Sequence, residues 1–381
     1  TPSNSSAASD VYKRQVNQYG GAIFDLGGNI LGAFVNLPTI AIPSGLNKLG
    51  SIGGWDTATD PTTILNVSDQ LTLLYGTDLG GMALGARLDF GMSTSSEPAK
   101  NDGDDKVSLM SGIVNLVVGL TMSGDLPLDI AINFGLPLIN NTGERYNNTT
   151  NALNGKQELS AGGSMSVGAA ARLALSSWLL NLSFGMNMNK LKSTQQVDSN
   201  ADEDFVDAGD TNLEETNESN TLSVGLGAAN TIKAGDSLSI IAGAVVNFSS
   251  TSGSDLVKDV NADTKSVDST NSSMSITVPL YVAVEGKLNE TWSVRGGLNR
   301  SIFTMSSSST KDNTTTPATE SETSTMGSVG ATNVSLGLTG VIGDFTVDGV
   351  LTTAILNQGP YFIAGNVLGN IFTNVSVIYK W

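Results

Sequence analysis

Residues 126–138, LPLDIAINFGLPL, show the pattern that most of the chain repeats. Leu, Ile or Phe occupies every even position of this stretch, whereas Asp129, Ala131, Asn133 and Gly135 occupy odd positions. Successive side chains of a β-strand point to opposite faces of a sheet. The alternation therefore predicts a strand with one large apolar face and one face of small or polar side chains.

The same alternation recurs in residues 178–189, 238–248 and 274–284, and 15 such segments follow one another from residue 17 to the C-terminus. Very short connections rich in Gly alternate with long polar ones, which predicts a series of hairpins with all long loops at one end. The short connections are 27–28, 79–81, 123–125, 176–177, 234–236, 288–290 and 343–344, and the long ones are 38–68, 96–106, 139–157, 193–218, 251–270, 307–329 and 358–370.

Composition excludes several classes of function. The 381 residues include no Cys and no His, so Ser-His-Asp and Cys-His catalysis are impossible, and we expect neither enzyme activity nor a cofactor. A net charge of −17 argues against binding to nucleic acid, because that affinity comes mainly from Lys and Arg. No apolar stretch approaches the roughly 18 residues of a transmembrane helix.

The residue types on the two faces of the predicted strands indicate whether each face contacts lipid or water. Only 14% of the residues are charged, and the small polar face lacks the Lys and Glu of an ordinary water-exposed surface. A lipid-facing apolar side and a small polar side lining a lumen account for both faces. Aromatic residues on the apolar side form two predicted girdles around the apolar band. They are Trp178, Trp292, Phe345, Tyr379 and Trp381 near the short turns, and Phe90, Phe134, Phe184 and Phe248 further away.

With these features, residues 17–381 resemble the Gram-negative outer-membrane β-barrel proteins, in particular porin-like barrels. The last segment, 371–381, alternates and ends in Trp381, like the assembly signal of that family. The resemblance implies an all-β, transmembrane, antiparallel up-and-down barrel in the bacterial outer membrane, with short periplasmic turns and long extracellular loops. It also implies contact with outer-membrane lipid and lipopolysaccharide, and with the barrel assembly machinery through the C-terminal strand.

The strand count is odd, whereas such barrels normally have an even number of strands and both termini in the periplasm. We therefore expect about 16 strands, with one N-terminal strand and the signal peptide missing; a 14-stranded barrel is the alternative. Residues 1–16 are small, polar and patternless, and we expect a disordered or non-native segment there. Residues 17–381 are expected to form a single barrel.

Charged residues on the predicted lumen side are few, carry both signs and lie near the short turns. They could form a charge belt that tunes ion passage, or pairs that brace the barrel wall. These residues are Arg87, Asp89, Asp129, Arg172, Glu285, Lys287, Arg295 and Asp348. A neutral polar lining is predicted above them from Asn115, Asn133, Asn181, Asn187, Asn247, Asn333 and Asn374.

This lumen predicts passive diffusion of small hydrophilic solutes and ions. Two alternatives remain: a fatty-acid-transporter-like barrel for hydrophobic molecules, and a closed structural barrel. The least polar loop, 38–68, could constrict the lumen or cover it from outside; its candidate residues are Pro38, Ile40, Ile42, Pro43 and Trp55. The acidic loop 198–218 begins like a calcium loop, but Glu203 stands where an EF-hand needs Gly, so we assign no metal site.

Overall fold

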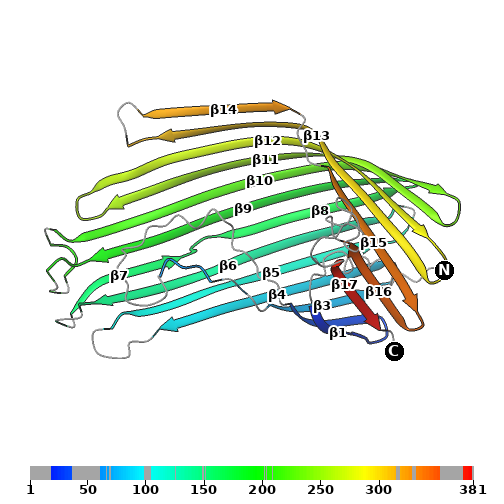
Figure 1. The fold of residues 1–381 in the computed structure, drawn as a ribbon, viewed down its shortest axis with the longest axis horizontal. Coiled ribbons are helices and arrows are strands. Elements are labelled where there is room, and N and C mark those ends of the chain that lie inside the picture. Colours follow the sequence, from blue (N-terminus) through cyan, green and yellow to red (C-terminus); the bar gives the residue numbers. More distant parts are fainter. Residues whose placement is uncertain are drawn as a thin grey trace, which may run out of the picture.

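The computed structural model describes residues 19–36, 61–65, 67, 70–97, 104–124, 126–147, 150, 152–200, 202, 204–207, 209–314, 318–327, 332–351 and 372–379. Their regular elements are β-strands that belong to one strongly curved sheet (Figure 1). Within these ranges, no helix is long and apolar enough to cross a membrane. The strands are β1 (Tyr19–Asp25), β2 (Asn29–Asn36), β3 (Gln70–Asp78), β4 (Met82–Glu97), β5 (Lys106–Met122), β6 (Leu128–Tyr146), β7 (Leu153–Ser160), β8 (Met165–Leu175), β9 (Trp178–Val197), β10 (Thr211–Ala234), β11 (Leu238–Asp259), β12 (Thr264–Lys287), β13 (Trp292–Asp312), β14 (Thr319–Gly327), β15 (Asn333–Ile342), β16 (Phe345–Leu351) and β17 (Phe372–Tyr379).

The strands pair antiparallel in the order of the chain, which makes the sheet an up-and-down meander. Two passes across the sheet are each split into two strands. β7 and β8 both lie between β6 and β9, and β14 and β15 both pair with β13. The 17 described strands thus make 15 passes, as the sequence predicts, and the antiparallel up-and-down barrel fold is confirmed.

β3 illustrates how alternate residues of a strand face opposite sides of the sheet. Thr72 and Leu74 are buried on one face, whereas Leu71 and Leu73 on the other face are 42% and 44% exposed. Large apolar side chains are exposed on this second face from β1 to β16, and we call it the outer face. An exposed apolar surface of this extent matches the lipid-facing band of a membrane barrel and not the surface of a soluble protein.

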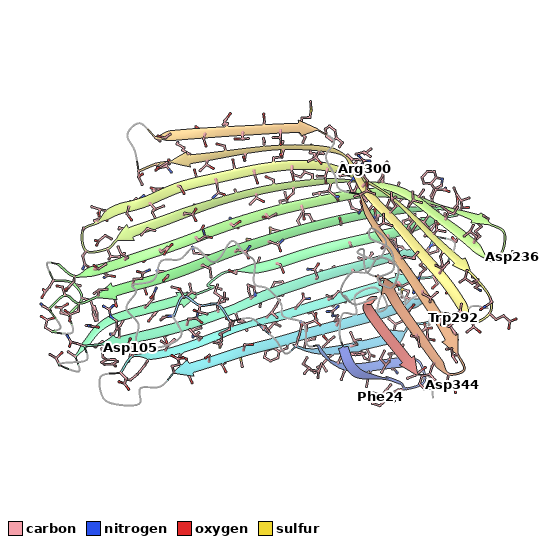
Figure 2. The ribbon with its side chains drawn as sticks, in the orientation of Figure 1. Phe24, Asp105, Asp236, Trp292, Arg300 and Asp344 are labelled. Carbon is pink, nitrogen blue, oxygen red and sulfur yellow. The ribbon has the colours of Figure 1, made fainter. Side chains whose placement is uncertain are left out.

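The predicted short turns lie together at one end of the sheet. Gly27, Gly80, Gly235 and Gly343 in these turns have φ of 70°, 72°, 75° and 59°, a backbone conformation that favours glycine. Figure 2 shows Asp236, Trp292 and Asp344 at this end of the molecule and Asp105 at the opposite end. The sheet therefore has a short-turn end and a far end.

At the far end the structure corrects the predicted loops. β9 and β10 are joined by residues 198–210 and not by 193–218, and β11 and β12 by 260–263 and not by 251–270. The other shortened connections are 98–105, 147–152 and 313–318. These polar segments continue the strands because ladder hydrogen bonds need no particular side chain. The sequence alternation disappears there because neither face lies against lipid.

The strands are much longer than a bilayer requires. β10 and β12 have 24 residues each, whereas a transmembrane strand needs about 9–11. On the outer face of β9 the apolar side chains end at Met188, and the next outward residue, Lys190, forms an ion pair of 2.5 Å with Glu218 on β10. The apolar band therefore ends near Met188, and the sheet continues beyond the membrane.

Site-directed spin labelling tests this orientation, and the absence of Cys allows one label at a time. Labels at Leu180, Leu182 and Phe184 should be accessible to lipid-soluble oxygen. Labels at Asn181 and Ser183 should be accessible instead to a water-soluble nickel complex, because they point inward. Equal accessibility of the two sets to both reagents would contradict the barrel.

Candidate functional site

The inner face of the sheet is the candidate site, and the cross-strand register defines it. Asp129 lies opposite Arg172, Asn133 opposite Gly168, and Asn181 opposite Gly227, so these residues share one face. The same registers place all eight predicted belt residues on this inner face, and they do not lie in one ring. Six of the eight form three separate ion pairs.

Arg87 and Asp89 form the most buried of these pairs. The Asp89 carboxylate is 1% exposed and accepts hydrogen bonds from Arg87 Nε at 2.8 Å, Thr72 Oγ1 at 2.7 Å and Asn115 Nδ2 at 3.1 Å. A buried carboxylate is tolerated when it is paired and hydrogen-bonded in this way. The cluster joins β3, β4 and β5 through the side chains of Thr72, Asp89 and Asn115.

The other two pairs are half exposed. Arg172 Nε donates to Asp129 Oδ2 at 2.7 Å between β8 and β6, and their side chains are 40% and 30% exposed. Arg295 on β13 pairs with Asp348 on β16, and both contact Thr339 on β15. Half-exposed pairs contribute about 0–1 kcal/mol each, because water screens them. Their main effect is to cancel the local charge of the wall.

Glu285 and Lys287 complete the predicted set. Glu285 lies opposite Arg295, and Lys287 lies opposite Ser293, both in the β12–β13 ladder. In the described part of the chain neither residue forms an ion pair. They leave one charge of each sign beside the Arg295–Asp348 pair.

The inner-face amides lie flat against the wall. A Cβ added at Gly168 would fall 2.1 Å from Asn133 Oδ1, and one added at Gly227 would fall 2.0 Å from Asn181 Oδ1. Each amide thus occupies the space left by a glycine on the neighbouring strand. Asn115, Asn187 and Asn247 share this face, and the register places Asn333 and Asn374 on it, although their side chains lie outside the described residues.

Beyond the amides, the inner wall of β10–β13 consists mainly of hydroxyl groups, which sequence reasoning did not single out. Thr221 and Thr251 hydrogen-bond across β10 and β11 at 2.9 Å, and Ser306 bonds Thr325 at 2.7 Å. The inner-face hydroxyl residues of these strands include Ser219, Thr221, Ser223, Ser249, Thr251, Ser273, Ser275, Thr277, Thr304, Ser306 and Ser308. This wall is neutral and can both donate and accept hydrogen bonds.

The adjoining wall, β5–β9, is covered at its far end by part of the long connection between β2 and β3. Asn141 Nδ2 donates to the carbonyls of Pro61 at 2.9 Å and Thr63 at 2.8 Å, and Leu65 N donates to Ser111 Oγ at 3.0 Å. Asn141 and Ser111 are fully buried. Residues 61–65 therefore lie on the inner face.

An apolar contact supports the same segment. Ile64 packs against Ile139, Leu159 and Leu191, which are buried on the inner face of β6, β7 and β9. The predicted constriction residues Pro38, Ile40, Ile42, Pro43 and Trp55 lie outside the described residues. Sequence reasoning missed the anchors, because Asn141 lies in the predicted loop 139–157 and Ser111 lies in a mostly apolar stretch without strict alternation.

The aromatic residues of the outer face lie on both sides of the apolar band. Trp178 is 52% exposed and Phe345 49% near the short turns, and Phe90, Phe134 and Phe184 are 42%, 39% and 43% exposed further up. Trp292 and Phe248 are partly buried. The side chain of Tyr379 and the whole of Trp381 lie outside the described residues.

Methionine residues mark the far edge of the apolar band on the outer face, which the sequence analysis did not identify; we call this edge the methionine border. The registers place all ten on the outer face, and Met165 lies opposite Met188, and Met305 opposite Met326, where the apolar band ends. Met92, Met110 and Met274 occupy the corresponding position on their strands. A flexible, polarisable side chain suits this boundary, because lipid packing there is irregular.

The acidic connection 198–210 is held by its own carboxylates. Asp210 accepts from Ser199 N at 2.8 Å and Ser199 Oγ at 2.9 Å, and the Ser199 backbone bond is the main cause that lowers the pKa of Asp210. Asp202, Asp204 and Asp207 are exposed. In the described part of the chain, no group of three or more His, Cys, Asp or Glu side chains is arranged to hold a metal ion.

Replacing Asn141 by Ala should release residues 61–65 from the wall. Three hydrogen bonds are lost, those to the Pro61 and Thr63 carbonyls and the one from Met110 N to Asn141 Oδ1, at about 1–3 kcal/mol for each group left without a partner. A spin label at Thr63 should become more mobile in the Asn141→Ala chain. Asn133→Ala, an inner-face amide away from the segment, is the control and should leave the spectrum unchanged; equal spectra in all three proteins would contradict the anchoring role.

No protein-family model and no curated protein sequence matches the chain. Several solved structures are similar in fold. The siderophore receptor PiuA from Acinetobacter baumannii is 10% identical, with a TM-score of 0.40, over 86% of this chain and 49% of that one. The ferric yersiniabactin uptake receptor FyuA from Yersinia pestis is 12% identical, with a TM-score of 0.37, over 74% and 44%. This chain thus spans less than half the length of either receptor.

The toluene transporter TodX from Pseudomonas putida is 11% identical, with a TM-score of 0.35, over 86% of this chain and 84% of that one. The three structures are outer-membrane β-barrel proteins. The likeness is one of fold. The exposed apolar outer face and the antiparallel meander of this chain are themselves those of a transmembrane β-barrel.

Proposed function

We propose that this barrel is a channel for passive diffusion of small hydrophilic solutes and ions across the outer membrane. The observation that carries the proposal is the polar inner face with its paired charges. Three ion pairs join six of the eight predicted belt residues, and amide and hydroxyl groups line much of the rest. Such groups can replace part of the hydration shell of a solute without binding one charge strongly.

The two walls differ, and this difference suggests the path. Residues 61–65 cover the inner face of β5–β9, whereas the hydroxyl wall of β10–β13 is partly exposed. Amides that lie flat over Gly168 and Gly227 keep the wall from narrowing the space. Solutes would therefore pass along the β10–β13 side.

An enzymatic role is disfavoured by the chemistry of the chain. Without His or Cys, a barrel hydrolase or protease would lack its usual general base. The most buried inner-face carboxylate, Asp89, is already engaged by Arg87, Thr72 and Asn115. It is therefore not poised to act on a substrate.

The fatty-acid-transporter-like alternative would need an apolar cavity on the inner face. The apolar cluster found there, Ile139, Leu159 and Leu191, is occupied by Ile64 of the same chain. This contact favours the hydrophilic channel. We also propose that the terminal strand β17, which pairs with β16, is recognised by the barrel assembly machinery.

Planar-bilayer recording of the refolded chain is the direct test. We expect discrete conductance steps that grow in proportion to salt concentration, because a neutral wide lumen conducts like bulk water. The Asn141→Ala chain should give larger or noisier steps if residues 61–65 narrow the path. Absence of steps would contradict the channel, and an apolar ligand that copurifies with a silent barrel would favour the transporter.

Ion selectivity should come from the far-end loops and not from the paired wall. We expect a mild cation preference at low salt that fades as salt rises, since charges are screened within about 8–10 Å at physiological ionic strength. Replacing the exposed Asp202, Asp204 and Asp207 together by Asn should reduce this preference more than Arg172→Ala changes it. Reversal potentials in a salt gradient measure both; a strong anion preference of the parent would contradict this prediction.

A further inference from the structure

Arg300 occupies an unusual place on β13. It lies opposite Leu280 in the β12–β13 ladder, and it shares the outer face with Leu298 and Ile302. Leu280, Leu298 and Ile302 are 39%, 44% and 46% exposed, and Arg300 itself is exposed. Of the outer-face residues that the structure describes between the short turns and the methionine border, Arg300 is the only charged one.

The local backbone directs this side chain. The register shifts between Val278 and Pro279, so Ile302 is an extra residue in β13, one position after Ser301. Pro279 has no N–H to donate to the ladder, and proline is found in sheets at edges or bulges. Figure 2 shows Arg300 at the point where β13 bends, between the part that pairs with β15 and the part that pairs with β14.

Arg300 also lies in the outer part of the apolar band. It is eight residues beyond Trp292 along β13, a rise of about 20 Å for a strand tilted by about 40°, in a band about 25 Å tall. A long Arg side chain at this depth extends its guanidinium toward the nearer polar boundary. That boundary is the headgroup region of the external leaflet.

The part of the chain that the structure describes offers no counter-charge to Arg300. In the described residues Arg300 forms no ion pair, and the outer face of the band offers no carboxylate. A second copy of the chain, packed beside this one at the same height, would present the same apolar band. The described outer face of that band has no carboxylate to pair with Arg300. Since a charge on the lipid face is unfavourable unless it is compensated, the partner must come from the membrane itself.

We infer that Arg300 is a binding site for the phosphate group of an anionic lipid in the external leaflet. The planar guanidinium donates two parallel hydrogen bonds to phosphate oxygens, which a neutral side chain at this position could not do. Leu280, Leu298 and Ile302 provide an apolar floor for the acyl chains below the phosphate. This inference needs only the barrel in a bilayer and is independent of the channel activity.

The test measures which lipid lies next to Arg300. A fluorescent label is attached to Leu298→Cys, on the same face as Arg300, in the full chain, which has no other Cys. The protein is refolded in phosphatidylcholine vesicles, and quenching by brominated phosphatidic acid is compared with quenching by brominated phosphatidylcholine. The control label is at Leu182→Cys on β9, where the outer face of the apolar band carries no charge.

We expect phosphatidic acid to be enriched about fivefold at position 298, equivalent to ~1 kcal/mol for one basic residue at an anionic surface, and not enriched at position 182. Arg300→Gln should abolish the enrichment, Arg300→Lys should keep part of it, and 1 M salt should reduce it. Equal quenching by the two lipids at position 298 of the parent chain would overturn the proposal and indicate a protein partner instead. That comparison needs no Arg300 variant, so a variant that fails to refold would leave the test intact.

Discussion

Backbone hydrogen bonding within a bilayer is the constraint on which the rest of this structure depends. Hydrocarbon offers no partner to an N–H or C=O group, so each unpaired group there costs several kcal/mol. The antiparallel ladders satisfy this demand pass by pass, from β1–β2 to β16–β17. Because the ladder fixes the pleat, every side chain must point either to lipid or to the interior. The apolar residues such as leucine on the lipid-facing side, and the asparagine or glycine residues on the inner side, follow from this fixed orientation of the side chains.

The same ladders continue beyond the membrane, and this explains the unusual strand lengths. β9–β13 keep pairing for many residues after the methionine border, where ion pairs such as Lys192–Glu214, at 3.0 Å, replace apolar contacts on the outer face. The sheet thereby provides the rigid surface on which residues 61–65 are held. Asn141, one of the residues that hold that segment, lies on the corresponding extension of β6, and Ser111 lies on β5 next to the border residue Met110.

The inner face is built to be polar without being strongly charged. Its acids and bases are neighbours across strands, so most of the field cancels close to the wall. Most of the acidic excess lies elsewhere, in connections such as 198–210. Arg300 is the exception on the other face, where none of the described protein groups cancels the charge.

The sequence by itself determined the number of passes, the short turns and the face of each belt residue, because a period of two is visible wherever one face meets lipid and the other water. The tertiary structure decided the rest. Strand ends such as Val197 and Thr211 could not be placed, since neither face there lies against lipid and the alternation vanishes. Which charges pair, as Arg295 does with Asp348, depends on register between strands far apart in sequence. The contact between Asn141 and Pro61 joins residues that no local pattern relates, so only the folded chain could show it.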